Sequence, residues 1–230
     1  MRITNKYIII FYRAIFIILC GYGLYLNSGI PTGNFSPVTF LYYTILSNIM
    51  CFVFIGICLI KNITQFKNWN KDDDHCITPK AKGGVTVGIT ITFLIYHFML
   101  VPQAFSMGDG FNLWTLPNLL VHYIVPIMVI ADWLLFDKKC NYRPYQPITW
   151  LLIPFVYFVF AMVRGFFGGA IFWESKYPYF FLDADKIGYL GVFKYFFVLA
   201  ILITVLGYIF YGIDRLLGFL FEKLKKSVKN

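Results

Sequence analysis

Three polar side chains interrupt a long apolar stretch of the sequence. The segment FLYYTILSNIM, residues 40–50, carries Thr44, Ser47 and Asn48 among hydrophobic neighbours. Positions i, i+3 and i+4 share one face of a helix, so two hydroxyls and an amide would lie side by side. Such a face forms either a hydrogen-bonding seam between helices or part of a reaction site. In the second case Thr44 would be a nucleophile, which requires a base to take its hydroxyl proton.

A base for that reaction is available in another apolar segment. His122 lies within LLVHYIVP, and an imidazole in hydrocarbon needs a partner for each nitrogen. His122 is therefore either a structural hydrogen-bonding group or a general base. His97 is either a structural or pore-lining partner or a functional group of the site. Arg164 either reaches the headgroups or binds a carboxylate or phosphate.

Hydrolysis of an ester would also need donors that stabilise a developing oxyanion. The side chains that we consider for this role or for substrate binding are Ser47, Asn48, His97, Asn118 and Arg164. The sequence contains no G-x-S-x-G, H-E-x-x-H, P-loop or S-x-x-K motif, and its five cysteines show no zinc or redox spacing. No metal or organic cofactor is predicted, and the cysteines are interpreted as packing residues or unpaired thiols.

The composition places these side chains in a membrane. Of 230 residues, 59% are hydrophobic and 13% are charged, whereas a soluble domain of this length needs far more polar surface. The net charge of +9 would suit nucleic acid, but the basic residues lie in loops and in the C-terminal segment. There they are explained by lipid headgroups and membrane topology, so no nucleic-acid partner is predicted.

Six apolar segments each have roughly the 17–25 residues that cross a bilayer. They run from about Lys6 to Tyr25, Val38 to Ile60, Gly84 to Val101, Pro117 to Phe136, Ile148 to Phe166 and Gly191 to Tyr211. The sequence therefore predicts an all-α polytopic membrane protein, with a six-helix transmembrane domain over residues 1–212. Residues 213–230 are predicted to form an amphipathic cytoplasmic tail, a helix with leucines and phenylalanines on one side and lysines on the other.

Positively charged residues predict how the spans are oriented. The segments 61–82, 137–147 and 213–230 are rich in lysine and arginine, whereas the loops over residues 27–37 and 102–115 contain neither. The positive-inside rule then places both termini in the cytoplasm. The abundance of Ile, Phe, Tyr, Lys and Asn is typical of an AT-rich bacterial genome, so the expected location is a bacterial cell membrane.

The predicted topology gives each polar side chain a depth. With a rise of 1.5 Å per residue, Thr44 lies about 9 Å below the outer surface, His122 about 8 Å and His97 about 6 Å, and Arg164 falls near the outer end of its span. Four helices would thus bring chemically capable side chains to one layer. If Thr44 and His122 act together, the Thr44 hydroxyl should lie within about 4 Å of a His122 nitrogen.

Two further charges and one aromatic loop allow structural interpretations. Arg13, in the middle of the first span, is expected to reach the headgroups or to pair internally. Asp132 is expected to mark the inner interface, beside Trp133 as an aromatic-belt residue. The outer segment Tyr177–Phe180 is interpreted either as an interfacial belt or as a lid over the site.

Several segments resemble the androgen-induced gene 1 / androgen-dependent TFPI-regulating protein family and its bacterial relatives. They are YYTILSNI, LLVHYIVPIMVIADWLLF, YRPYQPITWLLIPFVYFVFAMVRG and YPYFFLD, which occur in this order over nearly the whole chain. The resemblance implies a transmembrane threonine hydrolase that cleaves fatty acid esters of hydroxy fatty acids. It assigns the catalytic threonine to Thr44 and the histidine to His122. The large basic loop and the short, aromatic-rich ends are similar to the bacterial branch.

The function predicted from the sequence is hydrolysis of a lipid ester within the membrane. Thr44 would attack the ester carbonyl, and His122 would act as the base, first for the hydroxyl and then for water. The substrate would be a lipid or fatty acid ester that enters sideways from the bilayer. Two alternatives stay open: a pocket that binds or transports a fatty acid or small lipid without chemistry, and a purely structural membrane protein.

Overall fold

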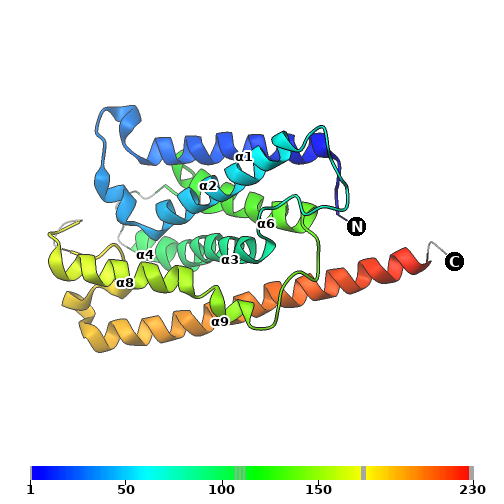
Figure 1. Ribbon diagram of the computed structural model, residues 1–230. Coiled ribbons are helices and arrows are strands. Elements are labelled where there is room, and N and C mark those ends of the chain that lie inside the picture. The colour runs from blue at the N-terminus through cyan, green and yellow to red at the C-terminus, as the bar shows by residue number, and fades with distance from the viewer. Residues whose placement is uncertain (1, 107, 109, 111, 172–174, 228–230) are drawn as a thin grey trace.

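Six helical segments that are long and apolar enough to cross a membrane form the bundle of the computed structural model (Figure 1). The structure describes residues 2–106, 108, 110, 112–171 and 175–227. The helices are α1 (Lys6–Asn27), α2 (Tyr43–Thr64), α3 (Pro79–Ile95), α4 (Val101–Ser106), α5 (Leu116–Leu119), α6 (Val125–Phe136), α7 (Gln146–Thr149), α8 (Leu152–Phe167) and α9 (Ala184–Ser227). Over the described residues, the predicted all-helical fold with six helices long and apolar enough to span a membrane is confirmed, and both termini lie at the same end of the bundle.

Short helical turns complete these elements. Two π-helical turns, η3 (Tyr96–Leu100) and η4 (Leu120–Ile124), join α3 to α4 and α5 to α6, so each of these pairs forms one span. The 3₁₀ turns are η1 (Ile30–Thr32), η2 (Pro37–Leu41) and η5 (Phe180–Leu182). The second span was expected to start near Val38, but η2 and the extended residue Tyr42 come first. Helix α2 therefore begins at Tyr43, and Thr44 lies in its first turn.

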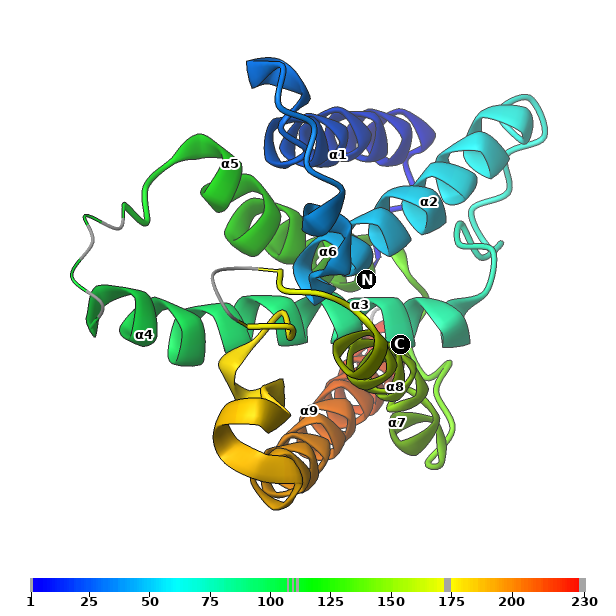
Figure 2. The same cartoon turned by 90° about the vertical axis from the view of Figure 1, so that its left-hand side faces the viewer.

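Helix α3 lies in the centre of the bundle. Viewed from the end opposite the termini, α1, α2 and α6 lie on one side of it and α8 and α9 on the other (Figure 2). Its residues from 82 to 92 are all buried, and small side chains let the neighbouring helices approach closely. A Cβ on Gly83 or Gly84 would meet the ring of Trp150, and one on Gly88 would meet the Tyr43 hydroxyl. The close packing around α3 positions the start of α2.

A buried ionic cluster ties α1, α3 and α6 together at the end that carries the termini. Arg13 forms a two-pronged ion pair with Asp132, and Lys82 pairs with both Asp132 and Asp137. All four side chains are at most 3% exposed. Arg13 thus pairs internally, one of its two expected roles. Asp132, expected to mark the inner interface, is enclosed between two cations. The interpretation of Trp133 as an aromatic-belt residue was wrong, because its side chain is buried in the bundle.

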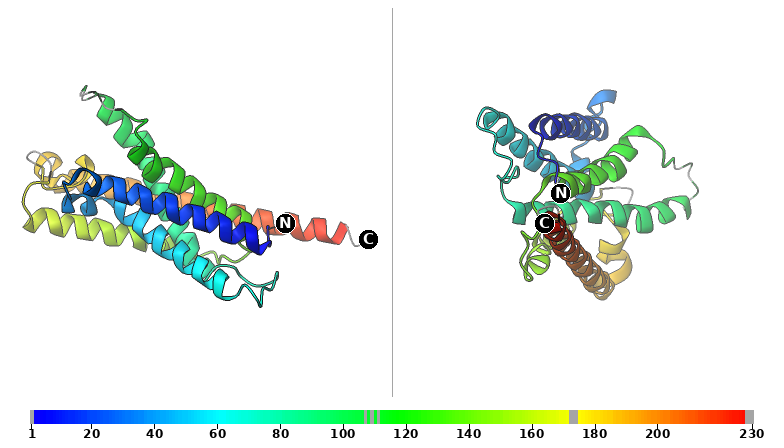
Figure 3. Two further views of the ribbon diagram at one scale, coloured as in Figure 1. Left: turned by 90° about the horizontal axis from the view of Figure 1, so that it is seen from above. Right: turned by 90° about the vertical axis from the view of Figure 1, so that its right-hand side faces the viewer.

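Helix α9 is much longer than the other helices. It extends from Ala184 to Ser227 and passes beyond the rest of the bundle (Figure 3). Its one break is at Gly188, whose φ of 69° lies in the left-handed region that glycine tolerates. The helix continues through residues 212 and 213, where the transmembrane domain was expected to give way to a separate tail. The basic C-terminal segment is therefore a direct extension of the last span.

Candidate active site

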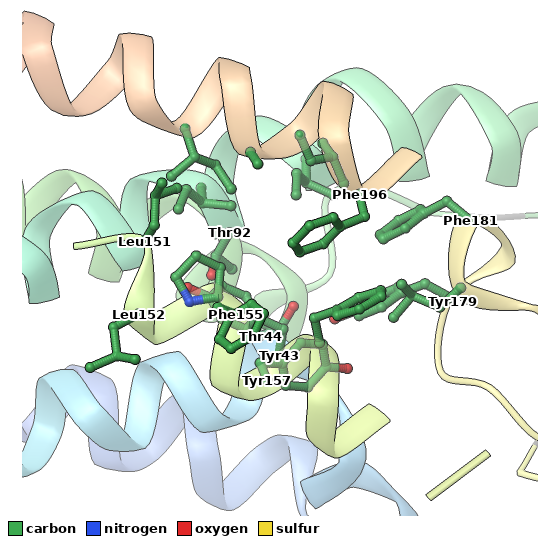
Figure 4. A pocket seen from close by; sticks show the side chains of 18 of the residues that line it. Tyr43, Thr44, Thr92, Leu151, Leu152, Phe155, Tyr157, Tyr179, Phe181 and Phe196 are labelled. Atoms are coloured by element: carbon green, nitrogen blue, oxygen red, sulfur yellow. The ribbon is translucent and has the colours of Figure 1, made fainter. Parts of the chain in front are cut away.

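The side chains of Thr44 and His122 meet at the wall of a cavity. The Thr44 Oγ1 atom lies 3.2 Å from Nε2 of His122. Thr44 comes from the first turn of α2 and His122 from the π-helical turn η4. Figure 4 shows Thr44 among the residues that line the cavity. His122 is not among the lining residues, so Thr44 is the member of this pair that forms part of the cavity wall.

A backbone carbonyl sets the tautomer of His122. Its Nδ1 atom lies 3.2 Å from the carbonyl oxygen of Asn118, and a carbonyl can only accept a hydrogen bond. Nδ1 of the neutral ring therefore carries the proton, and Nε2 keeps its lone pair toward the Thr44 hydroxyl. This arrangement suits a general base and uses a main-chain oxygen where many hydrolases use a carboxylate.

Both π-helical turns near the site have the same local cause. Pro102 follows η3 by two residues, and Pro126 follows η4 by two residues. A proline has no N–H for the carbonyl four residues earlier, and its ring displaces that carbonyl. The helix locally widens to a π turn, which is frequent at functional sites. In this protein the two widened turns carry Tyr96 and His122.

Tyr96 holds the imidazole of His122 in place. The two rings stack with centroids 3.5 Å apart and an interplanar angle of 15°. The Tyr96 hydroxyl is buried, and the Asn118 side chain is its polar neighbour. Sequence reasoning missed Tyr96 and selected the adjacent His97. The available signal was the spacing of Tyr96 from Thr92, since positions i and i+4 share a helix face.

Ser47 and Asn48 support the site from behind. The Asn48 amide donates to the carbonyls of Thr44 and Val121, at 2.7 and 3.0 Å, and so joins the first turn of α2 to η4. The Ser47 hydroxyl lies 2.7 Å from that of Thr92 on α3. Neither Ser47 nor Asn48 lines the cavity. Of the three polar residues on this face of α2, two fix the backbone and Thr44 faces the open space.

The other candidate side chains do not join Thr44 and His122. His97 is exposed on the outside of the bundle, and its Nδ1 atom lies 3.1 Å from the hydroxyl of Tyr123. Arg164 donates to the carbonyls of Gly169 and Lys176 in the following loop. The Asn118 side chain donates to the Leu113 carbonyl, so Asn118 serves the site through its main-chain oxygen. Of the four side chains expected in one layer, Thr44 and His122 thus form a close pair, and His97 and Arg164 lie elsewhere.

The cavity beside Thr44 has a volume of about 500 Å³ and a mostly apolar lining. It lies between the start of α2, the span containing α3, and the pair α8 and α9. The lining side chains of α8 and α9 are Leu152, Pro154, Phe155, Tyr157, Phe158, Phe196, Leu199, Ala200 and Ile203. Several polar groups in the wall are already paired, since the Tyr43 and Tyr157 hydroxyls donate to the carbonyls of Gly88 and Leu41. The space therefore suits a hydrocarbon chain better than a polar solute.

The loop before α9 folds over the cavity. Tyr177, Tyr179, Phe181 and Leu182 are each at most 9% exposed, and three of these four side chains line the cavity. The Tyr179 hydroxyl lies beside the Thr44 side chain and beside the main-chain N–H groups of Tyr43 and Thr44. Burial raises the pKa of Tyr179 to about 12, so its phenol is protonated at neutral pH and can donate. The burial fits the lid interpretation of this segment and not the interfacial belt.

No group of three or more His, Cys, Asp or Glu side chains among the described residues could hold a metal ion. All five cysteines are free thiols, and the Sγ atoms of Cys58 and Cys76 lie 3.9 Å apart.

Searches against protein-family models, curated proteins and solved structures found no match to this chain. The case for a function therefore rests on the geometry around Thr44.

Proposed function

We propose that this protein is an intramembrane lipid ester hydrolase in which Thr44 is the nucleophile and His122 the general base. The observation that carries the proposal is the 3.2 Å contact between Thr44 Oγ1 and His122 Nε2 at the wall of an apolar cavity. A threonine hydroxyl is a weak nucleophile until a base takes its proton, and the inferred tautomer of His122 leaves a lone pair in position to do so.

The reaction has two stages that both use His122. In the first, Nε2 takes the hydroxyl proton while Oγ1 of Thr44 attacks the ester carbonyl. The tetrahedral intermediate collapses, the alcohol leaves with the proton from Nε2, and an acyl-threonine ester forms. In the second, Nε2 removes a proton from water, which attacks the acyl ester. The fatty acid then departs, and Nε2 returns the proton to Oγ1 of Thr44.

Helix α2 and the lid supply candidate donors for the oxyanion. The main-chain N–H groups of Tyr43 and Thr44 lie in the first turn of α2, where no intrahelical carbonyl can accept from them. The partial positive charge of a helix N-terminus favours a developing negative charge. The Tyr179 hydroxyl, which faces the same two N–H groups, adds a side-chain donor. These groups replace His97 and Arg164, which lie elsewhere.

The substrate class follows from the cavity and from the resemblance to the threonine hydrolase family. An apolar space within a bundle of membrane-spanning helices favours a molecule with a long hydrocarbon chain, such as a fatty acid ester of a hydroxy fatty acid. With both termini in the cytoplasm of a bacterial cell, the site would lie in the outer half of the cytoplasmic membrane.

Purified protein with a panel of simple and branched lipid esters tests this proposal. We expect hydrolysis by the parent protein, and a decrease of at least about a hundredfold in Thr44→Ala and in His122→Ala, since a base alone contributes at least that factor. A fluorophosphonate probe should label the parent and not Thr44→Ala. Thr204→Ala is the matched control, because Thr204 lies on α9 away from the cavity and donates to its own helix at Ala200.

The main alternative is a protein that binds or moves a lipid without chemistry. The observation that favours it is the large apolar cavity, of about 500 Å³, which has a single reactive pair beside it. In that case the parent would hydrolyse no ester of the panel and would resist the probe. Thr44→Ala and His122→Ala would then bind a fatty acid as well as the parent does.

A further inference from the structure

The cavity beside Thr44 reaches the outside of the bundle between α8 and α9. Ile148, Leu152 and Phe155 line the cavity, yet each is about half exposed or more on the outer surface, at 55%, 63% and 47%. The backbones of α8 and α9 do not pack closely on each other, since α8 packs on α3, and α9 packs on α3, α7 and the turn η5. In a membrane, the exposed parts of these side chains would face lipid. The gap between the two helices thus connects the cavity with the hydrocarbon of the bilayer.

One aromatic side chain of α9 covers this gap. The ring of Phe196 points into the cavity toward α8 (Figure 4). Its centroid lies 4.5 Å from that of Phe158 and 6.2 Å from that of Phe155. The next residue, Phe197, is 62% exposed on the outer surface. The side chains of these two neighbouring phenylalanines therefore point in different directions. Phe196 covers the gap between α8 and α9, whereas Phe197 faces outward.

The cavity is elongated along the helices. Its lining extends on α7 and α8 from Ile148 to Phe158, ten residues or about 15 Å at the helical rise, and on α9 from Phe196 to Ile203. Thr44 lies near the Tyr157 and Tyr179 end, because Tyr43 packs on Tyr157 and Tyr179 faces Thr44. An ester carbonyl at Thr44 would place its chain along the cavity toward Ile148. An elongated apolar space of about 500 Å³ suits an extended alkyl chain.

We propose that an unbranched acyl chain enters this cavity sideways from the bilayer through the gap between α8 and α9, and that Phe196 controls the passage of long chains through that gap. The proposal deepens the proposed function, on which it rests for the identity of the chain as the acyl part of an ester. It makes Phe196 a specificity-determining residue that touches the substrate but takes no part in bond making.

Substitutions at Phe196 test the proposal by two independent measurements in lipid nanodiscs. The first compares hydrolysis of palmitoyl and butyryl esters. The second measures photolabelling of cavity residues by a diazirine analogue of palmitic acid, in a Thr44→Ala background where no hydrolysis occurs. Phe196→Trp places a larger side chain in the gap, and Phe196→Leu places a smaller one there. Phe197→Ala is the matched control on the outer surface.

We expect Phe196→Trp to lower both photolabelling and the palmitoyl to butyryl rate ratio by about tenfold, the usual effect of reshaping a hydrophobic pocket. Phe196→Leu should raise both, and Phe197→Ala should change neither. Thr44-dependent hydrolysis that is indifferent to Phe196 would overturn sideways access and leave the hydrolase proposal standing. Photolabelling that depends on Phe196, in a protein without esterase activity, would support the access route and reject the hydrolase.

Discussion

Arg13 of α1 and Asp132 of α6 form a two-pronged ion pair inside the bundle, with Nε to Oδ2 at 2.9 Å and Nη2 to Oδ1 at 3.0 Å. Arg13 also donates to the Asn62 side chain and to the His75 carbonyl, so α1 is joined to α2 and to the following loop. Lys82 of α3 shares the same carboxylate. One carboxylate therefore holds two cations from two other helices.

Removing that carboxylate should destabilise the fold strongly. Asp132→Asn would leave Arg13 and Lys82 buried with less negative charge around them, and loss of one partner of a buried ion pair costs about 3–5 kcal/mol. Thermal unfolding in detergent micelles measures the change. The exposed pair Lys176–Asp185 provides the control, because Asp185→Asn should cost about 1 kcal/mol or less. Equal losses from the two substitutions would contradict the assigned role of Asp132.

Tyr96 should affect catalysis through its ring and not through its hydroxyl. Tyr96→Phe keeps the stacking on His122, so we expect ester hydrolysis close to that of the parent. Tyr96→Leu removes the flat surface that holds the imidazole, and a poorly oriented base should lower kcat by about tenfold or more. The comparison of kcat and KM for the two variants decides the point. A large loss in Tyr96→Phe would instead give the hydroxyl a direct role.

Asn48 should position the nucleophile. Asn48→Ala leaves the carbonyls of Thr44 and Val121 without their side-chain donor, which costs about 1–3 kcal/mol of stability. It also loosens the link between α2 and η4, so kcat should decrease while KM changes little. Asn62 offers a matched control, because it is a buried asparagine of the same helix whose amide donates to the His75 carbonyl, beside Arg13 in the ionic cluster. Asn62→Ala should lower stability and leave kcat unchanged.

His75 should make the fold sensitive to acid. Its ring stacks on Trp69 with centroids 4.3 Å apart. Burial, with the positive charges of Arg2 and Arg13, lowers the pKa of His75 from 6.5 to about 4. Between these two pH values the unfolded chain binds the proton and the folded protein does not. The neutral ring therefore makes its full contribution to the free energy of unfolding above pH 6.5. That contribution is lost as the pH falls toward 4.

The substitution that isolates this effect is His75→Phe, which retains an aromatic ring against Trp69 and removes the titrating group. Melting temperatures of both proteins should be compared over a pH series. The parent should lose more stability than His75→Phe as the pH falls from about 6.5 to 4. Parallel curves would show that His75 does not titrate in this range.

Cys140 provides a test of orientation. It is exposed and lies in the loop between α6 and α7, at the end of the bundle that carries the termini. If that end faces the cytoplasm, a membrane-impermeant maleimide should label Cys140 in inverted vesicles and not in intact cells. A cysteine replacing the exposed Thr32 at the opposite end, in a Cys140→Ser background, should show the reverse pattern. The opposite result for both positions would invert the predicted topology.

The sequence predicted the spans well because the bilayer constrains them to long apolar helices. The start of α2 was misjudged because Pro37–Leu41 is as apolar as the helix that follows and forms a 3₁₀ turn instead. The ionic cluster was not predicted as a unit. Lys82 was counted as a loop residue, and its contact with Asp132 joins positions fifty residues apart in the chain.

The pairing of Thr44 with His122 was predictable from depth, since both spans descend from the same side. Depth is one coordinate, however, and the direction in which a side chain points around its helix is another. His97 was expected in the same layer, and its side chain faces the outside of the bundle beside Tyr123. Tyr96 takes the inward direction because it lies four residues after Thr92 on the same helix face, and both residues line the cavity.

The straight part of α9 after Gly188 is about 58 Å long at the helical rise, whereas the hydrocarbon core of a bilayer is about 30 Å thick. Its emerging portion is anchored at the bundle, since Asp214 accepts from the Tyr142 main chain and Arg215 donates to the carbonyl of the same residue. The helix over residues 214–227 is thus a rigid extension that is anchored where it leaves the bundle. A fluorescent protein fused to it would be held at a defined standoff, with little of the free rotation that a flexible tether allows.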